Sequence, residues 1–215
     1  MATTSGLRPL LERGLDGLGL ALADDRLERL LAYVALLSRW NTAFNLTAVR
    51  DAAAMVPRHL LDSLAILPWV RGPRLLDVGT GPGLPGIPLA IADPGLQVVL
   101  LDANGKKVRF CRQAVVDLGL RQVDVVQARV ETYRPAYGFT TITARAVAGL
   151  PSLLASVGHL LAPDTTLLAM KGALPEAEIA ALETQGLMVA VHRLRVPGVD
   201  GERHLIEIRS RGQSA

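Results

Sequence analysis

The stretch Asp77-Val-Gly-Thr-Gly-Pro-Gly-Leu-Pro-Gly86 decides the fold of this 215-residue chain. It overlaps the end of a short apolar run, Leu75–Val78, and leads into a segment whose first turn is set by prolines. Three of its residues, Gly79, Gly81 and Gly83, have no side chain to block a ligand. Such residues let backbone amides approach a ligand closely and permit positive φ angles. The stretch therefore predicts a strand, a ligand-binding loop and a helix.

The spacing of the loop distinguishes two classes of ligand. A nicotinamide-dinucleotide loop has the pattern G-x-G-x-x-G, but the sixth position counted from Gly79 is Leu84. Here an acid, Asp77, precedes a G-x-G-x-G pattern. A carboxylate at this point suits a cationic ligand, either by direct attraction to an ammonium or by anchoring the loop and its bound water. The predicted cofactor is S-adenosylmethionine, which carries an ammonium and a sulfonium.

A second acid, Asp102, ends the next apolar run and lies 23 residues after Gly79. That separation is typical of one β-α-β unit, and an acid there can accept both hydroxyls of a ribose. Either acid alone is more often part of an Asx turn or a helix cap. Asp77 and Asp102 together with the glycine loop favour a nucleoside cofactor.

Short apolar runs alternate with helical segments from residue 74 onward. Five runs predict strands at Leu75–Val78, Gln97–Leu101, Val123–Gln127, Thr140–Thr143 and Thr165–Met170. Continuous apolar runs suit strands buried on both faces, and so a parallel sheet covered by helices. Two alternating segments, Leu187–Val196 and His204–Ile208, predict a terminal antiparallel hairpin. This order indicates an α/β fold, the doubly wound, Rossmann-like sheet of class I S-adenosylmethionine-dependent methyltransferases.

The residues before this sheet predict helices. Apolar residues recur at helical spacing from Leu27 to about Asn41, and a second helix is expected from Ala52 to Leu67, stopped by Pro68. We expect one domain, with a helical cap at residues 1–70 on a core at residues 71–215.

Composition limits which metal sites, cellular locations and partners are expected for the protein. The one cysteine, Cys111, allows no intramolecular disulfide, and no Cys/His cluster has zinc-like spacing, so no metal is expected. The Leu-rich N-terminus is interrupted by acids and no run has membrane length, so we expect no membrane partner and a cytoplasmic protein. The net charge is +3, and 20 of the 23 basic residues are Arg. That bias suits phosphate contacts, although a G+C-rich coding sequence also produces it, so charge does not decide the function.

Several stretches together resemble one known family. The loop from Leu76 to Leu89 resembles the cofactor loop of the bacterial RsmG family, also called GidB, which methylates guanine N7 in small-subunit ribosomal RNA. Further stretches resemble the signatures of that family in the same order: Trp40-Asn with Asn45-Leu-Thr47, Arg58-His-Leu-Leu-Asp-Ser63, Leu101-Asp with Gly105-Lys106, Arg145-Ala, Lys171-Gly and Gly201-Glu-Arg-His-Leu205. The resemblance covers about residues 33–209.

The resemblance implies a site and a substrate. The implied cofactor contacts are Gly79, Leu84, Asp102, Val130, Glu131 and Arg145. One departure is Ala144, where the family is expected to carry Ser, which puts a hydroxyl contact there in doubt. The implied reaction is transfer of a methyl group to guanine N7 in 16S ribosomal RNA, either free or in the small subunit, and we expect a monomer.

This reaction needs alignment rather than a general base, because guanine N7 carries a lone pair and no proton at neutral pH. Arg145 follows the fourth strand and is expected to contact either the base edge or the cofactor carboxylate. His59 and Asp62 share one helix face and are candidates to shape the guanine pocket, although a lone His is as often a satisfied core residue. Candidates for phosphate contacts are Arg58, Lys171, Arg203 and His204, each of which is singly more typical of a solvated surface.

Three alternatives remain open at this point. One is a methyltransferase acting on a protein or a small molecule, which shares the cofactor loop. Another is a nicotinamide-dependent oxidoreductase, which the loop spacing disfavours. The third is a non-catalytic RNA-binding or ribosome-assembly protein, against which the intact loop and acids argue.

Overall fold

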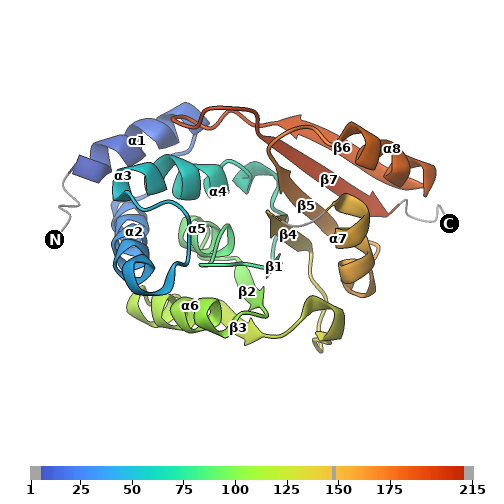
Figure 1. Cartoon of the computed structure of the whole chain (residues 1–215), viewed down its shortest axis with the longest axis horizontal. Coiled ribbons are helices and arrows are strands. Elements are labelled where there is room, and N and C mark those ends of the chain that lie inside the picture. The colour runs from blue at the N-terminus through green and yellow to red at the C-terminus, as the bar shows by residue number, and fades with distance from the viewer. Residues whose placement is uncertain (1–5, 147–148, 211–215) are drawn as a thin grey trace.

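The structure, a computed structural model, describes residues 6–146 and 149–210 (Figure 1). Its centre is a seven-stranded sheet with strand order β3-β2-β1-β4-β5-β7-β6. The strands are β1 (Arg74–Val78), β2 (Gln97–Asp102), β3 (Val123–Gln127), β4 (Thr141–Arg145), β5 (Thr166–Lys171), β6 (Leu187–Arg193) and β7 (His204–Ser210). The first five strands are parallel, and β7 lies antiparallel between β5 and β6. The predicted doubly wound α/β sheet with a terminal antiparallel hairpin is confirmed.

The order of the strands reverses between β1 and β4. From β1 the chain proceeds outward to β2 and β3, then returns to place β4 on the other side of β1. Val78 on β1 lies opposite Ala144 on β4, so the segments that follow these two strands leave the sheet side by side. Such a switch point creates a crevice at the carboxyl ends of the strands, where ligands of α/β proteins bind.

Helices cover both faces of the sheet (Figure 1). Those of the first half are α1 (Leu7–Leu18), α2 (Asp24–Phe44), α3 (Ala52–Met55), the π-helical η2 (Val56–Leu61), α4 (Asp62–Leu64), the 3₁₀ turn η3 (Leu67–Trp69), α5 (Gly86–Ala92) and α6 (Gly105–Asp117). The remaining ones are the 3₁₀ turns η4 (Val130–Thr132) and η5 (Gly158–Leu160), with α7 (Leu150–Val157) and α8 (Glu176–Thr184). Helices α1, α2, α5 and α6 lie on one side of the sheet and α7 and α8 on the other.

Alternate strand residues enter the two layers of the core. Leu100 packs with the cluster beneath the N-terminal helices, whereas Leu101 packs with the cluster beneath α7 and α8. This alternation is expected of strands with period 2 that are buried on both faces. The first cluster extends from Leu7 on α1 to Leu205 on β7. The N-terminal helices and the sheet therefore share one hydrophobic cluster, and the single domain stays a prediction.

The helix expected from Ala52 to Leu67 has a different internal geometry. It consists of α3, η2 and α4 in direct succession, with a π-helical turn at its centre. Pro57 lies at the start of that turn and has no amide hydrogen for a regular helical bond. Strand β6 ends at Arg193, earlier than the predicted Val196, and Leu194 then pairs through its amide with the carbonyl of Arg203. Among the described residues, no helix is long and apolar enough to cross a bilayer.

Candidate active site

The loop after β1 is organised around the carboxylate of Asp77, which is completely buried. Its Oδ2 accepts hydrogen bonds from the Thr80 hydroxyl at 2.5 Å and the Gly86 amide at 2.9 Å. Its Oδ1 accepts one from the Thr143 hydroxyl at 3.2 Å. The sequence left two roles open for Asp77, attraction of an ammonium or anchoring of the loop. These contacts show that Asp77 anchors the loop.

Burial dominates the acidity of this group. Desolvation raises the pKa of Asp77 from its ordinary value of 3.8 to about 6, although the bonds from Thr80 and Gly86 act in the opposite direction. The three donors make a buried carboxylate tolerable, since an unpaired one would cost far more. Thr80 and Thr143 therefore belong to the site, and no spacing in the sequence indicated either.

The glycines of the loop serve different purposes. Gly79, Gly81 and Gly83 have φ angles of 64°, 61° and 92°, in the left-handed region that glycine adopts at little cost. An added Cβ on Gly81 would meet only the Gly79 carbonyl, at 4.0 Å, so the backbone here lies open to a ligand. Gly86 is different, because a Cβ there would lie 2.3 Å from Leu100 Cδ2 and 2.9 Å from Asp77 Oδ2.

Asp102 connects the glycine loop to the end of β2. Its Oδ2 accepts the Gly81 amide at 2.9 Å, and its Oδ1 accepts the Asn104 amide at 2.8 Å, which forms an Asx turn. Each carboxylate oxygen has a second lone pair that can accept a ribose hydroxyl. The Asx turn and the predicted ribose contact are therefore compatible, and the residues present fit an adenosine-containing cofactor beside Gly81.

Two side chains from distant helices support the back of the loop. The hydroxyl of Tyr33 on α2 donates to the Pro82 carbonyl at 2.8 Å. The thiol of Cys111 on α6 donates to the Gly81 carbonyl at 3.4 Å. Burial raises the pKa of both groups, so both remain protonated donors. Sequence spacing contained no signal for these contacts, because the partners lie 49 and 30 residues apart.

The other predicted cofactor residues lie along the same edge of the sheet. Leu84 is buried within the loop. Val130 and the exposed Glu131 begin η4, just after β3. Since Gln127 on β3 lies opposite Asp102 on β2, this turn follows the strand next to the predicted ribose site. Cofactor contacts at these positions stay predictions.

A cavity of about 340 Å³ lies at the carboxyl ends of β4 and β5. Its lining includes Arg58, Asp62, Arg145, Lys171, Arg203 and His204. These are six of the seven residues predicted to be catalytic or RNA-binding, and they come from four separate stretches of the chain. We call this the active-site cavity.

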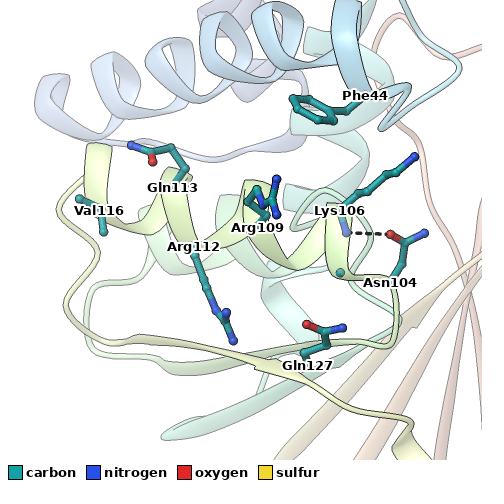
Figure 2. Close-up of a pocket in the computed structure, with 9 residues that line it drawn as sticks. Phe44, Asn104, Lys106, Arg109, Arg112, Gln113, Val116 and Gln127 are labelled. Atoms are coloured by element: carbon teal, nitrogen blue, oxygen red, sulfur yellow. Dashed lines mark hydrogen bonds between the residues drawn. The ribbon is translucent and has the colours of Figure 1, made fainter.

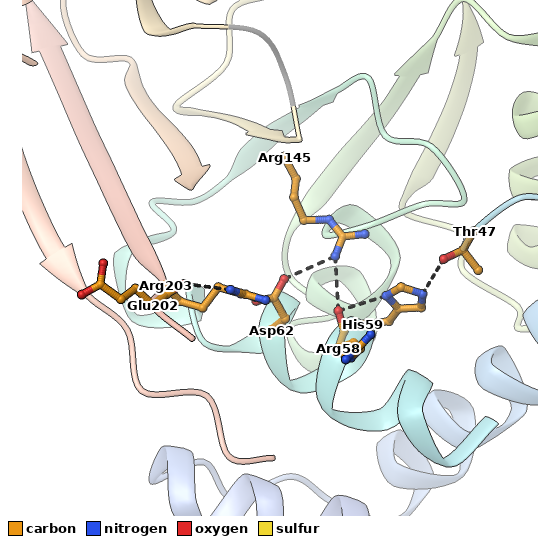
Figure 3. Close-up of polar contacts among 7 residues, drawn as sticks. All are labelled: Thr47, Arg58, His59, Asp62, Arg145, Glu202 and Arg203. Carbon is orange, nitrogen blue, oxygen red and sulfur yellow. Dashed lines mark hydrogen bonds and ion pairs between the residues drawn. The ribbon is translucent and has the colours of Figure 1, made fainter. Parts of the chain in front are cut away.

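Asp62 holds two arginines of the active-site cavity in place (Figure 3). Its Oδ2 lies 3.3 Å from Arg145 Nη1 and its Oδ1 lies 3.2 Å from Arg203 Nε. Nη1 of Arg145 also reaches the Arg58 carbonyl at 3.5 Å. Asp62 is buried, and a buried carboxylate with two guanidinium partners is well compensated.

His59 is buried beside the active-site cavity but does not line it (Figure 3). Its Nε2 lies 2.9 Å from the Thr47 hydroxyl and its Nδ1 lies 3.0 Å from the Arg58 carbonyl. Burial and the charge of Arg145 lower the pKa of His59 from 6.5 to about 4. A neutral ring that donates to the carbonyl and accepts from the hydroxyl satisfies both nitrogens. The geometry favours the core interpretation of His59 that the sequence left open, and a catalytic role stays a prediction.

Lys171 and His204 reach the active-site cavity from neighbouring strands. Lys171 Nζ lies 3.7 Å from Glu178 Oε2 on α8, and His204 Nδ1 lies 2.8 Å from the Gly172 carbonyl. The two residues are directly opposite each other in the β5–β7 pair.

The charge of the active-site cavity favours an anionic ligand. Four cationic side chains line it, against the one carboxylate of Asp62. That carboxylate already pairs with two arginines. The lining therefore keeps a net positive charge, which suits phosphate groups. Within residues 6–146 and 149–210, no group of three His, Cys, Asp or Glu side chains is placed to hold a metal ion.

Comparison with known proteins assigns this arrangement to a family. A protein of Methylococcus capsulatus named ribosomal RNA small subunit methyltransferase G is 52% identical over 96% of this chain and 100% of its own length. One of the same name from Xanthomonas oryzae pv. oryzae is 54% identical over 93% of each chain. Among solved structures, the glycopeptide N-methyltransferase MtfA with S-adenosylmethionine superposes with a TM-score of 0.62 at 13% identity, over 72% of this chain and 88% of that one. The likeness to MtfA shows that the fold is that of class I S-adenosylmethionine-dependent methyltransferases. Since the model of the GidB family, described as rRNA small subunit methyltransferase G, matches residues 26–206, the chain belongs to that family.

Proposed function

We propose that this protein transfers a methyl group from S-adenosylmethionine to N7 of a guanine in 16S ribosomal RNA. The supporting observation is the position of the active-site cavity beside the glycine loop. Val78 and Ala144 are partners in the sheet, so the loop after β1 and Arg145 at the end of β4 are neighbours. A cofactor on the loop would present its methyl group toward a cavity lined with cations.

The chain's own residues orient the base rather than remove a proton. Bound S-adenosylmethionine supplies the sulfonium methyl, and guanine N7 supplies its lone pair, so a general base is unnecessary. Both described hydrogen bonds of Arg145 use Nη1. Its Nε and Nη2 are therefore available, with respect to the described residues, to donate to guanine O6 and fix the plane of the ring.

The cations around Arg145 would position the RNA backbone. Arg58 is exposed. Arg203 is held at Nε by Asp62 and at Nη1 by the Glu202 carbonyl, which leaves Nη2 without a described partner. Guanidinium forks bind phosphate in two-point contacts that a fixed side chain makes at lower entropic cost. We propose the same role for Lys171 and His204.

We further propose that the enzyme acts as a monomer in the cytoplasm, on ribosomal RNA or the small subunit. In support, one chain provides the glycine loop, Asp102 and the whole lining of the active-site cavity. A second subunit is not needed to complete the site.

In vitro methylation with labelled S-adenosylmethionine tests the function. Small-subunit RNA is incubated with the protein, and cleavage at N7-methylguanine maps the modified base. We expect one cleavage site that disappears with Arg145→Ala, and the unfolding transition of that variant verifies that it remains folded at the assay temperature although Asp62 has lost one partner. Label on protein or metabolites with ribosomal RNA unlabelled would instead establish a methyltransferase of another class. Binding of RNA without any transfer would indicate an assembly factor.

A further inference from the structure

A second cavity lies along α6, outside the active-site cavity (Figure 2). It has a volume of about 790 Å³. Its lining includes Phe44, Lys106, Arg109, Arg112, Gln113 and Gln127. We call this the α6 groove, and the residues predicted to bind the cofactor or to act in catalysis are not among its lining.

The α6 groove carries cations without acidic partners. Lys106, Arg109 and Arg112 are exposed, and none of them forms an ion pair with a described residue. The neighbouring Lys107 differs, because its Nζ lies 3.9 Å from Asp102 Oδ2. No acidic side chain is among the lining that the structure describes. Like charges three residues apart on one helix repel each other, so this surface favours a polyanion.

The other lining groups suit nucleotides. Phe44 ends α2 with 36% of its surface exposed, and its ring packs on Trp40 at a centroid distance of 5.2 Å. A supported, partly exposed ring can stack on an unpaired base. Figure 2 shows Phe44 above Lys106 and Arg109, with the amides of Gln113 and Gln127 at either side of the helix. A positively charged groove with an aromatic ring is the combination by which proteins contact single-stranded RNA.

The position of the α6 groove connects it to the active site. α6 begins at Gly105, three residues after Asp102, and Gln127 ends the paired strand β3. The groove therefore begins at the carboxyl edge of the sheet, the same edge that carries the active-site cavity. The two cavities lie on opposite sides of the glycine loop, one beyond β2 and the other at β4 and β5.

We propose that the α6 groove binds the backbone of the RNA strand that flanks the target guanine, with Arg109 and Arg112 on phosphates and Phe44 beneath a base. The proposal rests on the function proposed above and adds a second contact region to it. It also gives a role to Lys106, which belongs to a signature of the family that the active-site cavity does not use.

The test compares three double variants with the wild type. Arg109→Gln with Arg112→Gln removes two charges from the groove. Arg13→Gln with Arg29→Gln is the matched control, because both residues are exposed arginines on α1 and the first half of α2 without described partners. Arg109→Lys with Arg112→Lys keeps the charge and should retain wild-type behaviour. Thermal midpoints and S-adenosylmethionine affinity, measured for all of them, verify the fold and the cofactor site.

Three readouts decide the outcome. For small-subunit RNA, the groove variant should show KM raised about tenfold with kcat unchanged, and a slope of log affinity against log salt lower by about 1.4, roughly 0.7 for each phosphate that the variant no longer neutralises. For a trinucleotide carrying the target guanine, KM should equal that of the wild type. KM and salt slope equal to those of the control variant would overturn the proposal while leaving the function intact. If the wild type fails to methylate ribosomal RNA, the proposed function fails, and the salt slope of RNA binding still decides the groove.

Discussion

At the scale of single residues, the site depends on buried polar groups that have more than one partner. Asp77 accepts three hydrogen bonds from the loop and β4. Asp102 joins Gly81 to Asn104, and His59 joins Thr47 to the Arg58 carbonyl. Removing such a group leaves its partners unsatisfied, and each unsatisfied buried group costs about 1–3 kcal/mol. Stability and ligand affinity are therefore coupled in these residues.

Asp102→Ala should weaken S-adenosylmethionine binding by at least about tenfold, because it removes the acceptor proposed for the ribose and frees the Gly81 amide. The variant should stay folded with a free energy of unfolding lower by about 1–3 kcal/mol. Calorimetric titration and urea unfolding measure the two effects. Asp164→Ala, at an exposed position, is the control. Unchanged affinity in a folded Asp102 variant would remove the ribose assignment.

His59 should make the protein less stable in acid. Its folded pKa of about 4 is below the unfolded value of 6.5, so its contribution is complete above pH 6.5 and is lost as the pH falls toward 4. The loss amounts to about 3.5 kcal/mol, at about 1.4 kcal/mol for each unit of difference between the two pKa values. Asp77 acts in the opposite sense, since its raised pKa gives stability below pH 3.8 that is lost as the pH rises through about 6.

Urea unfolding between pH 4 and 7 tests this prediction. His59→Gln should lose stability less steeply on acidification than the wild type, because the contribution of Asp77 is common to both proteins. The exposed His159 provides the control variant, His159→Gln. Identical slopes for wild type and His59→Gln would show that the ring is not held neutral in the fold.

At the scale of elements, backbone geometry decides where ligands and side chains fit. β1 ends at Val78, and its loop returns so that α5 begins at Gly86, directly against Asp77. The close approach of α5 to β1 and β2 leaves no room for a side chain at that residue. Gly158, between α7 and η5, is different, because a Cβ there would meet nothing within 4 Å.

Two glycine substitutions should therefore change the free energy of unfolding in opposite directions. Gly86→Ala should lower the free energy of unfolding by about 1–3 kcal/mol, because the new Cβ overlaps Leu100 and Asp77. Gly158→Ala should raise it by about 0.4–1 kcal/mol, since Gly158 has helical angles in open space and alanine restricts the unfolded chain. Thermal and urea unfolding of both variants give the comparison. Equal effects of the same sign would contradict the packing described for α5.

At the scale of the whole molecule, the active-site cavity exists because distant segments meet at one edge of the sheet. Asp62 on α4 contacts Arg145 on β4 and Arg203 before β7, which are 83 and 141 residues away along the chain. The shared core from α1 to β7 fixes the N-terminal helices against the sheet. We infer that Asp62 positions the two arginines without having to touch the substrate.

Asp62→Asn should lower kcat for ribosomal RNA methylation by about tenfold or more, because an amide pairs weakly with two guanidinium groups and Arg145 loses its orientation. Affinity for S-adenosylmethionine should change little, since the glycine loop and Asp102 are untouched. Single-turnover rates and calorimetry separate the two quantities, and Asp62→Glu tests for partial rescue. A kcat equal to that of the wild type would exclude the positioning role.

The order of the strands and helices along the chain, the glycine loop and the two acids were predictable from the sequence, because each depends on local patterns. Continuous apolar runs mark strands buried on both faces, and glycine spacing marks a backbone with positive φ angles. The bounds of the predicted strands are close to those in the structure, and the largest difference is at the end of β6. The helix at residues 52–67 was predicted as one element, but its π-helical turn was not, because periodicity cannot register one changed turn.

Which partners each side chain meets was decided by the tertiary structure alone. The sequence could not show that Asp77 faces inward to Thr143, that Asp62 lies between two arginines, or that Phe44 lines the same groove as the cations of α6. The hydrogen-bonded pairs among these are separated by 66, 83 and 141 residues. Local propensity follows from neighbouring residues, whereas a contact between distant residues follows from how buried faces pack together.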